Sequence, residues 1–319
     1  MTRQRGGTIG DCMRVLGHIH TFNEADVIDR SLAALRGQSV PVEEVLLVDN
    51  ASTDATLDRS FPPDVRVVRF ASNRMTSDPI IEAMRWADAH DYDWVWVLNG
   101  DTAPRPECLA TLLGFFDALE PATRDAVWLL AALPVDATTG EGVHGFRLSP
   151  RGLEQLHDAG AAPYECDAAI WSGSLYRVAG IRRAGLPRSD YQMDVAEIEY
   201  GYRGRCAGLR AFVVPAAIAE HNIGGPSVRP APWRLGPLRL ELVELAPFRC
   251  YYVARNVLHF WLYLYRERTF VTVLYAFARV AKLSGSFVLR PRSRRRQLAA
   301  CLRGAWDGLR GRLDYRPAV

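Results

Sequence analysis

The chain has 319 residues, of which 49% are hydrophobic and 24% are charged, and its formal net charge is +3. This length and composition can bury a sizeable core, which argues against a disordered chain. A net charge this small does not by itself indicate nucleic-acid binding, so we expect no nucleic-acid partner. The charge is unevenly placed, because arginines crowd together near the C-terminus: Arg290, Arg292, Arg294, Arg295 and Arg296.

Neither the cysteines nor the N-terminal residues indicate export. The six cysteines are widely scattered and form no CxxC pair, which favours reduced thiols over a disulfide framework. The first residues lack the apolar core of a signal peptide. Charged residues at 266–268 separate the longest apolar runs, 257–265 and 269–278, and neither run reaches the ~20 residues that span a bilayer. We therefore expect a cytoplasmic protein that does not cross the membrane.

The first hundred residues alternate strand-like and helix-like segments, a pattern typical of parallel strands joined by crossover helices. In chain order we expect a strand at 15–20, a helix after Asn23, strands at 44–48 and 65–70, a helix at 80–90 and a strand at 94–98. Ligands of open α/β sheets bind beyond the carboxyl ends of such strands. The polar turns near Asn23, Asp49 and Asp101 should therefore gather at one edge of the sheet.

Further along the chain the pattern is less regular. Strand-like segments occur at 127–133 and 211–215, residues 226–237 are rich in proline and arginine and should form a linker or loop, and residues 239–309 read as helices. We predict an α/β domain with a mostly parallel sheet over residues 11–225. A helical and basic region should follow over residues 226–319.

Two of the polar turns carry candidate ligands for a nucleotide or a metal ion. After an apolar strand, Asn99-Gly100-Asp101 projects a carboxylate to a position where a divalent ion that holds a diphosphate takes hard oxygen ligands. Asp49 ends another buried strand, and its carboxylate could accept hydrogen bonds from a nucleotide base or ribose. Both turns also have a purely structural explanation, because these residue types favour turns and helix N-caps.

In their order along the chain, three segments resemble the nucleotide-binding half of family-2 glycosyltransferases: Thr21-Phe22-Asn23-Glu24, residues 48–54 and Asn99-Gly100-Asp101. The resemblance implies a GT-A fold, a Rossmann-like α/β arrangement that binds nucleotide sugars. It implies a hexosyltransferase that uses a UDP- or dTDP-sugar as donor. The acceptor would be a glycan or a lipid-linked molecule of cell-surface polysaccharide synthesis, and a divalent cofactor, Mg²⁺ or Mn²⁺, would assist.

A further match lies in the second half of the chain. Residues 194–203 resemble a segment of bacterial rhamnosyltransferases and galactofuranosyltransferases in which acidic residues are followed by an aromatic residue, glycine and arginine. The resemblance implies that Glu197 is the catalytic base, with Glu199 as the next acidic residue, and that His221 completes a metal site with Asp101. An exposed helix face and a packed histidine are the alternative interpretations.

The resemblance also implies a set of donor ligands, most of which follow the ends of expected strands: Thr21, Asn23, Asp49, Asn73, Arg74, Asn99 and Asp101. Thr21 and Asp49 would hold the nucleoside, and Arg74 could contact the diphosphate. Trp171 and Tyr191 are candidates to stack on the acceptor sugar, although large aromatic side chains usually serve as core.

Two positions depart from the family pattern. Asn99 stands where the metal motif usually begins with aspartate, and Ala196 stands at the first acidic position of the base motif. These departures leave open a protein that has lost activity and serves as a scaffold. The absence of a glycine-rich phosphate loop after the first strand disfavours a sugar nucleotidyltransferase, and the absence of G-x-G-x-x-G there disfavours a dinucleotide oxidoreductase.

The C-terminal region predicts a contact with an anionic membrane surface. Residues 251–289 hold more aromatic and aliphatic side chains than one helix face needs, and the arginines at 290–296 would lie at anionic headgroups. This combination suits a lipid-linked acceptor and a peripheral position on the inner face of the membrane. The alternative is a helical subdomain or a homodimer interface with a solvated basic loop.

Overall fold

The computed structural model describes residues 13–137, 139–156, 160–221, 228–235, 238–288 and 294–314. The chain divides into two compact units. The first unit comprises Met1–Arg147, Gln155–Pro187 and Tyr200–Asn222, and the second comprises Leu148–Glu154, Arg188–Glu199 and Ile223–Val319. Two short segments that precede residue 200 therefore group with the C-terminal region, a division that a single boundary near residue 225 does not describe.

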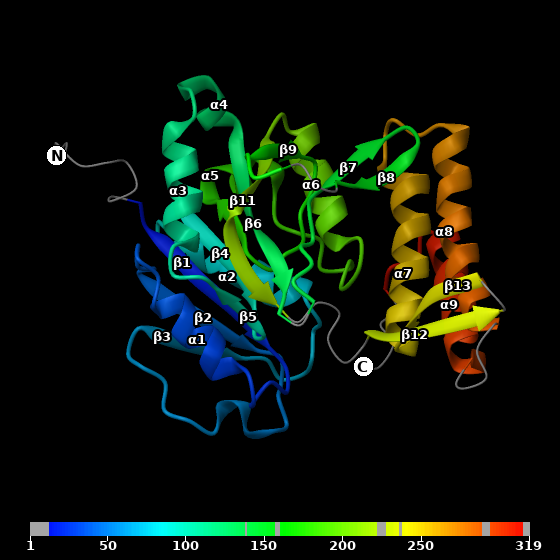
Figure 1. The fold of residues 1–319 in the computed structure, drawn as a ribbon, viewed down its shortest axis with the longest axis horizontal. Helices are drawn as coiled ribbons and strands as arrows, with labels where there is room; N and C mark the ends of the chain where they lie inside the picture. The colour runs from blue at the N-terminus through cyan, green and yellow to red at the C-terminus, as the bar shows by residue number, and fades with distance from the viewer. Residues whose placement is uncertain are drawn as a thin grey trace. The chain divides into compact units, whose positions relative to one another are not determined.

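Among the described residues, the first unit is built on a nine-stranded sheet with the order β3-β2-β1-β4-β10-β6-β11-β5, and β9 pairs with β11 (Figure 1). The strands are β1 (Val15–Thr21), β2 (Glu44–Asp49), β3 (Val65–Arg69), β4 (Trp94–Asn99), β5 (Thr102–Pro104), β6 (Val127–Asp136), β9 (Tyr164–Cys166), β10 (Ser174–Arg177) and β11 (Arg210–His221). A small hairpin of β7 (Phe146–Ser149) and β8 (Gly152–Gln155) has residues in both units.

The main strands of this sheet point in one direction. β1 pairs in parallel with β2 and β4, and β2 pairs in parallel with β3. β10 is antiparallel to both β4 and β6, and β11 is parallel to β6, so β6 and β11 share the direction of β4. Their carboxyl ends consequently lie at one edge. The mostly parallel sheet predicted from the alternation of strand and helix is confirmed.

Helices accompany the sheet of the first unit, and the longer ones bury apolar residues. They are α1 (Ile28–Arg36), α2 (Ser77–Ala89), α3 (Cys108–Ala118), α4 (Pro121–Ala126) and α5 (Val178–Ala184), with a short 3₁₀ helix, η2 (Ala55–Leu57), and most of α6 (Ala196–Cys206). α1 buries Ile28, Leu32 and Leu35, which recur at helical spacing. β4 reads as a continuous apolar run because both of its faces are buried.

Glycine lets α6 approach the sheet closely. A Cβ atom at Gly204 would overlap the indole ring of Trp128, and a Cβ atom at Gly201 would overlap the carbonyl oxygen of Asp167. Trp128 is fully buried on β6, and its ring meets the edges of Tyr176 and Tyr200. The indole therefore has no room to move away from a larger side chain on α6.

We expect Gly204→Ala to destabilise the first unit by about 1–3 kcal/mol, because an extra methyl group in a filled core forces neighbouring side chains out of place. Thermal unfolding measures the effect. The matched control is Gly114→Ala on α3, where a Cβ atom would meet nothing within 4 Å and the helix should gain slightly in stability. Equal melting temperatures for Gly204→Ala and the parent protein would contradict the close packing of α6.

The second unit corrects one prediction. Residues 228–235 and 238–245 form two antiparallel strands, β12 (Val228–Leu235) and β13 (Leu238–Leu245), not a linker followed by helix. Leucine alternates with charged residues over much of β13, which is the period of a strand. Pro230 and Pro232 are two positions apart on β12, so their missing N–H groups both fall on the same edge of the ribbon, where proline is tolerated.

The remainder of the second unit is largely helical, as predicted. It contains α7 (Pro247–His259), the π-helical turn η3 (Phe260–Leu264), α8 (Phe270–Val288) and α9 (Arg294–Leu309). α9 packs closely on α7, where the hydroxyl group of Tyr251 donates a hydrogen bond to Asp307 Oδ2 at 3.0 Å. No helix among the described residues is long and apolar enough to cross a membrane.

Candidate functional site

The carboxyl ends of β1 and β2 hold two of the predicted turns together. Thr21 is opposite Asp49 in the β1–β2 ladder. The backbone N–H of Asn23 donates to Ser52 Oγ at 2.9 Å, and the backbone N–H of Thr53 donates to Asn23 Oδ1 at 2.8 Å. The third turn follows β4, which pairs with the other side of β1. All three turns therefore meet at one edge of the sheet, as the sequence pattern predicts.

Glu24 belongs to this edge, although sequence reasoning assigned it no role. Its carboxylate accepts a hydrogen bond from Thr21 Oγ1 at 2.8 Å, and a Cβ atom at Gly100 would overlap it. Burial raises the pKa of Glu24 to about 7; repulsion from Asp101 adds to the rise, and the Thr21 hydrogen bond opposes it. Its position directly after Asn23, in the first matched segment, was the available signal.

Asp101 and His221 lie against each other in the first unit. Asp101 Oδ1 is 3.0 Å from His221 Nδ1, and the two side chains are 16% and 10% exposed. His221 is opposite Thr102 in the β5–β11 ladder, and its Nδ1 atom lies 3.2 Å from Thr102 Oγ1. The pairing of β11 with β5 thus brings together two residues that are far apart in the sequence.

The spacing of this pair fits a divalent ion. Two ligands at right angles around an octahedral ion, each at about 2.1 Å, lie about 3.0 Å apart. The buried Asn99 Oδ1 atom, at the end of β4, has no hydrogen-bond partner among the described residues. In the part of the chain that the structure describes, no group of three or more His, Cys, Asp and Glu side chains could hold a metal ion. An ion at Asp101 and His221 would therefore need oxygen atoms from its substrate or from water.

His20 is a further neighbour of the pair that the sequence did not single out. It is opposite Asn99 in the β1–β4 ladder. Burial lowers the pKa of His20 to about 4; Asp101 opposes this shift, and His221 adds to it. The Nδ1 atom of His20 is buried and has no hydrogen-bond partner among the described residues. A neutral imidazole with an unpaired ring nitrogen therefore lies at the same edge.

Asp49 is fully buried and stabilises its own turn. Its Oδ2 atom accepts a hydrogen bond from the backbone N–H of Ser52 at 3.1 Å and lies 3.4 Å from Arg69 Nε. Asp54 caps η2 by accepting from the backbone N–H of Thr56. A carboxylate can accept more hydrogen bonds than these, so Asp49 can stabilise its turn and still accept a hydrogen bond from a nucleoside.

Asn73 and Arg74 lie beyond β3. The backbone N–H of Met75 donates to Asn73 Oδ1 at 2.7 Å, and the backbone N–H of Arg74 donates to Asn50 Oδ1 at 3.2 Å. The exposed guanidinium of Arg74 lies over the ring of Phe70, 4.9 Å from its centre. Asn73 therefore shapes the loop, and Arg74 offers a positive charge at the surface.

Glu197 lies in the second unit, near the start of α6. Burial raises its pKa to about 7; the Asp194 carboxylate also raises this pKa, and Arg249 lowers it. Glu199, on the same helix, is buried. An ordinary glutamate has a pKa near 4.3, so Glu197 binds a proton more strongly than usual and can act as a base near neutral pH.

The loop before Glu197 is held by α7. Arg249 forms two hydrogen bonds with Asp194, at 2.9 and 3.0 Å, and Asn256 Nδ2 donates to the carbonyl oxygens of Met193 and Asp194. Val195 has a φ of 74°, which is strained for a β-branched residue. Such strain persists only where surrounding contacts impose it. Arg249 and Asn256 are thus positioning residues for the loop that precedes Glu197.

The two aromatic candidates for acceptor stacking are enclosed by other side chains. Trp171 is buried beside Tyr176 and Tyr200 in the first unit. Tyr191 is buried in the second unit, where its hydroxyl group lies 2.6 Å from His259 Nδ1. This geometry favours a packing role for both rings, and stacking on a sugar would require each side chain to become exposed.

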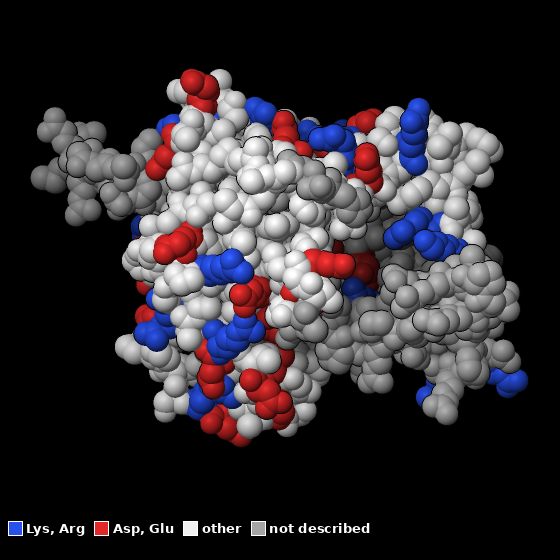
Figure 2. Space-filling view, viewed as in Figure 1, with Lys and Arg blue, Asp and Glu red and all other residues white. Residues whose placement is uncertain are grey.

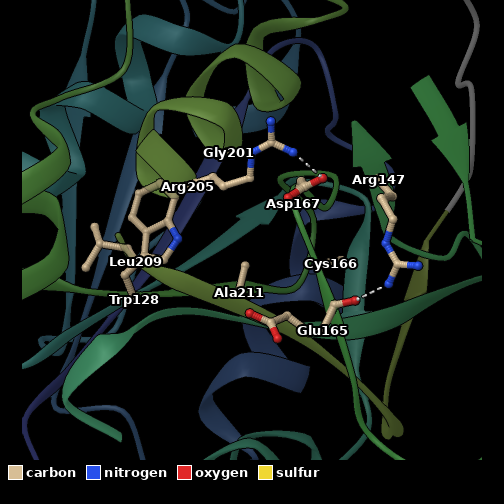
Figure 3. A pocket seen from close by; sticks show the side chains of 9 residues that line it. All are labelled: Trp128, Arg147, Glu165, Cys166, Asp167, Gly201, Arg205, Leu209 and Ala211. Carbon is tan, nitrogen blue, oxygen red and sulfur yellow. Dashed lines mark hydrogen bonds and ion pairs between the residues drawn. The ribbon is translucent and has the colours of Figure 1, made fainter. Parts of the chain in front are cut away.

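A pocket in the first unit lies at the opposite edge of the sheet, where β6 and β11 begin (Figure 3). Its lining residues are Trp128, Arg147, Glu165, Cys166, Asp167, Gly201, Arg205, Leu209 and Ala211. Arg205 Nη1 lies 3.1 Å from Asp167 Oδ2, and Arg147 donates to the carbonyl oxygen of Glu165 at 3.3 Å. β11 runs from this pocket to His221, so the pocket is separate from the site at the carboxyl edge.

Open α/β sheets bind their ligands beyond the carboxyl ends of the strands, which is where the polar turns and the Asp101–His221 pair lie. Residues 18–127 match the model of glycosyl transferase family 2. An undecaprenyl-phosphate mannosyltransferase of Micrococcus luteus is 29% identical over 210 residues, which cover 64% of this chain and 71% of that protein. The predicted likeness to rhamnosyltransferases and galactofuranosyltransferases is not confirmed, because this relative is a mannosyltransferase.

Solved structures show the same fold. The mannosyltransferase PcManGT from Pyrobaculum calidifontis, in complex with GDP-Man and Mn²⁺, has a TM-score of 0.55 and 15% identity, over 94% of this chain and 88% of that chain. GalNAc-T7 with UDP, GalNAc and Mn²⁺ has a TM-score of 0.54 and 14% identity, over 66% of this chain and 43% of that chain. These comparisons confirm the GT-A type of α/β fold and, with the family match, support a glycosyltransferase.

Proposed function

We propose that the chain is an inverting glycosyltransferase that moves a sugar from a nucleoside diphosphate to a lipid-linked or glycan acceptor. The observation that carries the proposal is the close Asp101–His221 pair at the carboxyl edge of a family-2 domain. The undecaprenyl-phosphate mannosyltransferase supports a lipid-linked acceptor. A product of this kind belongs to cell-surface polysaccharide synthesis.

The acceptor hydroxyl attacks the anomeric carbon from the face opposite the nucleoside diphosphate, and the bond to the departing diphosphate breaks. Glu197 takes the proton of that hydroxyl, and its raised pKa makes it a stronger base than an ordinary glutamate. Glu199 is the second acidic side chain of the same helix. Because the nucleophile comes from the acceptor, no covalent bond to the enzyme is needed.

The remaining roles belong to the carboxyl edge of the sheet. Asp101 and His221 would hold a divalent ion, Mg²⁺ or Mn²⁺, which when bound neutralises charge on the diphosphate. Asn99 offers an oxygen atom there without the charge of an aspartate. Thr21, Asn23 and Asp49 would hold the nucleoside, Asn73 would shape the donor loop, and Arg74 would contact the diphosphate.

We place the protein on the inner face of the cell membrane as a peripheral, cytoplasmic enzyme. A lipid-linked acceptor requires access to the membrane surface, and the C-terminal region supplies cations for it. Arg295 and Arg296 are exposed on α9. Arg290 and Arg292, and the side chain of Arg294, lie outside the described residues.

A donor screen tests the proposal. UDP-, dTDP- and GDP-sugars are added to the purified protein with Mn²⁺ or with chelator, and the melting temperature and slow hydrolysis of each sugar nucleotide are measured. GDP-mannose is included because the solved mannosyltransferase holds it. We expect one nucleotide class to raise the melting temperature in the presence of metal and its sugar to be released slowly. The corresponding nucleoside monophosphate, which lacks both the second phosphate and the sugar, should not raise the melting temperature.

Two outcomes would contradict the proposed enzymatic activity. Binding of a sugar nucleotide without hydrolysis, or without transfer to any lipid-linked or glycan acceptor, would favour a scaffold that has lost activity. A screen in which no nucleotide changes the melting temperature would contradict the proposal that the carboxyl edge of the sheet binds a sugar nucleotide.

A further inference from the structure

The helix α8 in the second unit turns an apolar face outward. Four of its large apolar side chains are exposed: Phe270 (75%), Val271 (50%), Leu274 (51%) and Phe277 (44%). The opposite face is occupied, since Thr272, Ala276 and Val280 are buried. The outward residues are therefore not the core-facing stripe of an ordinary amphipathic helix.

The exposed side chains form one continuous strip. Successive residues of an α-helix are rotated by about 100°, so Phe270, Leu274, Phe277 and the exposed Ala281 lie along one side, over about 17 Å of helix. A soluble protein that functions alone rarely presents a strip of large apolar side chains to water. This strip is better explained by a partner that is itself apolar.

The charges along α8 show what kind of partner fits. The helix contains Arg279 and Lys282, both exposed, and no aspartate or glutamate. Arg266, Glu267 and Arg268, just before the helix, are also exposed and add one net positive charge. A helix that lies in a membrane interface combines an apolar face with cations that reach anionic headgroups. At about 100° per residue, Lys282 lies about 120° and Arg279 about 180° around the helix from Phe270, so these cations lie off the apolar strip and α8 has an apolar side and a cationic side.

The neighbouring helix α9 has similar features. Leu302 and Trp306 are exposed one helical turn apart, and the guanidinium of Arg310 lies 4.0 Å from the centre of the Trp306 ring. In Figure 2, where white marks every residue other than Lys, Arg, Asp and Glu, white and blue atoms lie at the upper right, where Figure 1 places α8, whereas blue and red atoms are mixed over the first unit. Tryptophan and arginine together suit the headgroup level of a membrane.

We propose that the outward strip of α8 inserts into the boundary between headgroups and acyl chains of an anionic lipid surface. Phe270, Leu274 and Phe277 lie among the upper acyl chains, while Arg279 and Lys282 bind lipid phosphates. The helix lies along the membrane plane and does not cross it. This inference deepens the proposed function, on which it rests for the lipid-linked acceptor, and makes a helix face rather than the arginine cluster the principal contact.

Co-sedimentation with vesicles tests this face. The full chain is mixed with vesicles of phosphatidylcholine alone or with added phosphatidylglycerol, at low and high salt. We expect binding to the anionic vesicles and at least a tenfold loss of binding for Leu274→Ser/Phe277→Ser. Arg279→Ser/Lys282→Ser should weaken binding to anionic vesicles mainly at low salt, because salt screens this contribution. The control is Val67→Ser, which removes an exposed apolar side chain from β3 in the first unit.

The replaced side chains are exposed, so the variants should fold, and far-ultraviolet circular dichroism verifies this. Equal vesicle binding by the parent protein and Leu274→Ser/Phe277→Ser would overturn the proposal. So would a parent protein that binds no vesicles and sediments as a dimer that the same double variant dissociates. Donor hydrolysis without vesicles is measured in parallel: its absence with vesicle binding intact argues against the glycosyltransferase, whereas the reverse result argues against the lipid face.

Discussion

Glu197→Gln is expected to slow sugar transfer by about 10²-fold or more, while the affinity for the donor stays near that of the parent protein. Glutamine keeps the size and hydrogen-bonding capacity of the side chain but cannot take a proton from the acceptor. Single-turnover transfer and nucleotide binding, measured separately, resolve the two effects. Glu107→Gln, which makes the same change at an exposed position before α3, is the control and should leave both unchanged.

The pH dependence of transfer is a second test of the role of Glu197 as the base. The raised pKa of Glu197, about 7, means that its carboxylate is mostly protonated below neutral pH and free above it. Transfer by the parent protein should therefore rise with pH through about 7, where half of the carboxylate is free, and level off about one pH unit higher, and Glu197→Gln should lose this rise. Transfer by Glu197→Gln at a near-parental rate would remove Glu197 as the base. It would favour an acceptor whose attacking oxygen is already ionised, such as a lipid phosphate.

Asp101→Ala and His221→Ala are each expected to weaken metal-dependent binding of the nucleoside diphosphate by about tenfold or more, because each removes one of two adjacent ligands of the ion. Calorimetric titration with Mn²⁺ and with chelator measures the loss. Asn99→Asp provides a comparison of opposite sign, since a carboxylate beside the pair should strengthen metal binding. Diphosphate binding that chelator does not change in the parent protein would contradict the metal site and leave Arg74 as the charged contact.

Local patterns were sufficient for the first half of the fold. The apolar runs within β2 and β4 are uninterrupted, whereas β1 includes Gly17, His18 and His20 but is still buried over most of its length. Each of these strands ends in residues that favour turns, so the strands could be predicted from the sequence. The rule that ligands bind at carboxyl ends then placed Asn23, Asp49 and Asp101 at one edge. The antiparallel pair of β12 and β13 was missed because the prolines of β12 suggested a loop, although the alternation in β13 was visible.

The site itself depended on contacts between distant segments. His221 could be chosen only by resemblance, and it is the pairing of β11 with β5 that sets its Nδ1 atom 3.0 Å from Asp101. Glu24 lies in the first matched segment, but its burial beside that aspartate, like that of His20, arises only when the strands assemble. A pKa shift depends on burial and on nearby charge, and both are properties of the folded chain.

By itself, the sequence determined the α/β class, the positions of the principal strands along the chain and the residue types at their ends, because these follow from periodicity and turn chemistry over short distances. Only the tertiary structure decided which polar side chains meet, which aromatic rings are enclosed, and that the apolar residues of α8 face outward. The physical reason is the same in each case. The sequence of a helix with apolar residues on two sides does not tell whether the second side contacts protein, lipid or water. Only the packing of neighbouring elements shows which side is left uncovered.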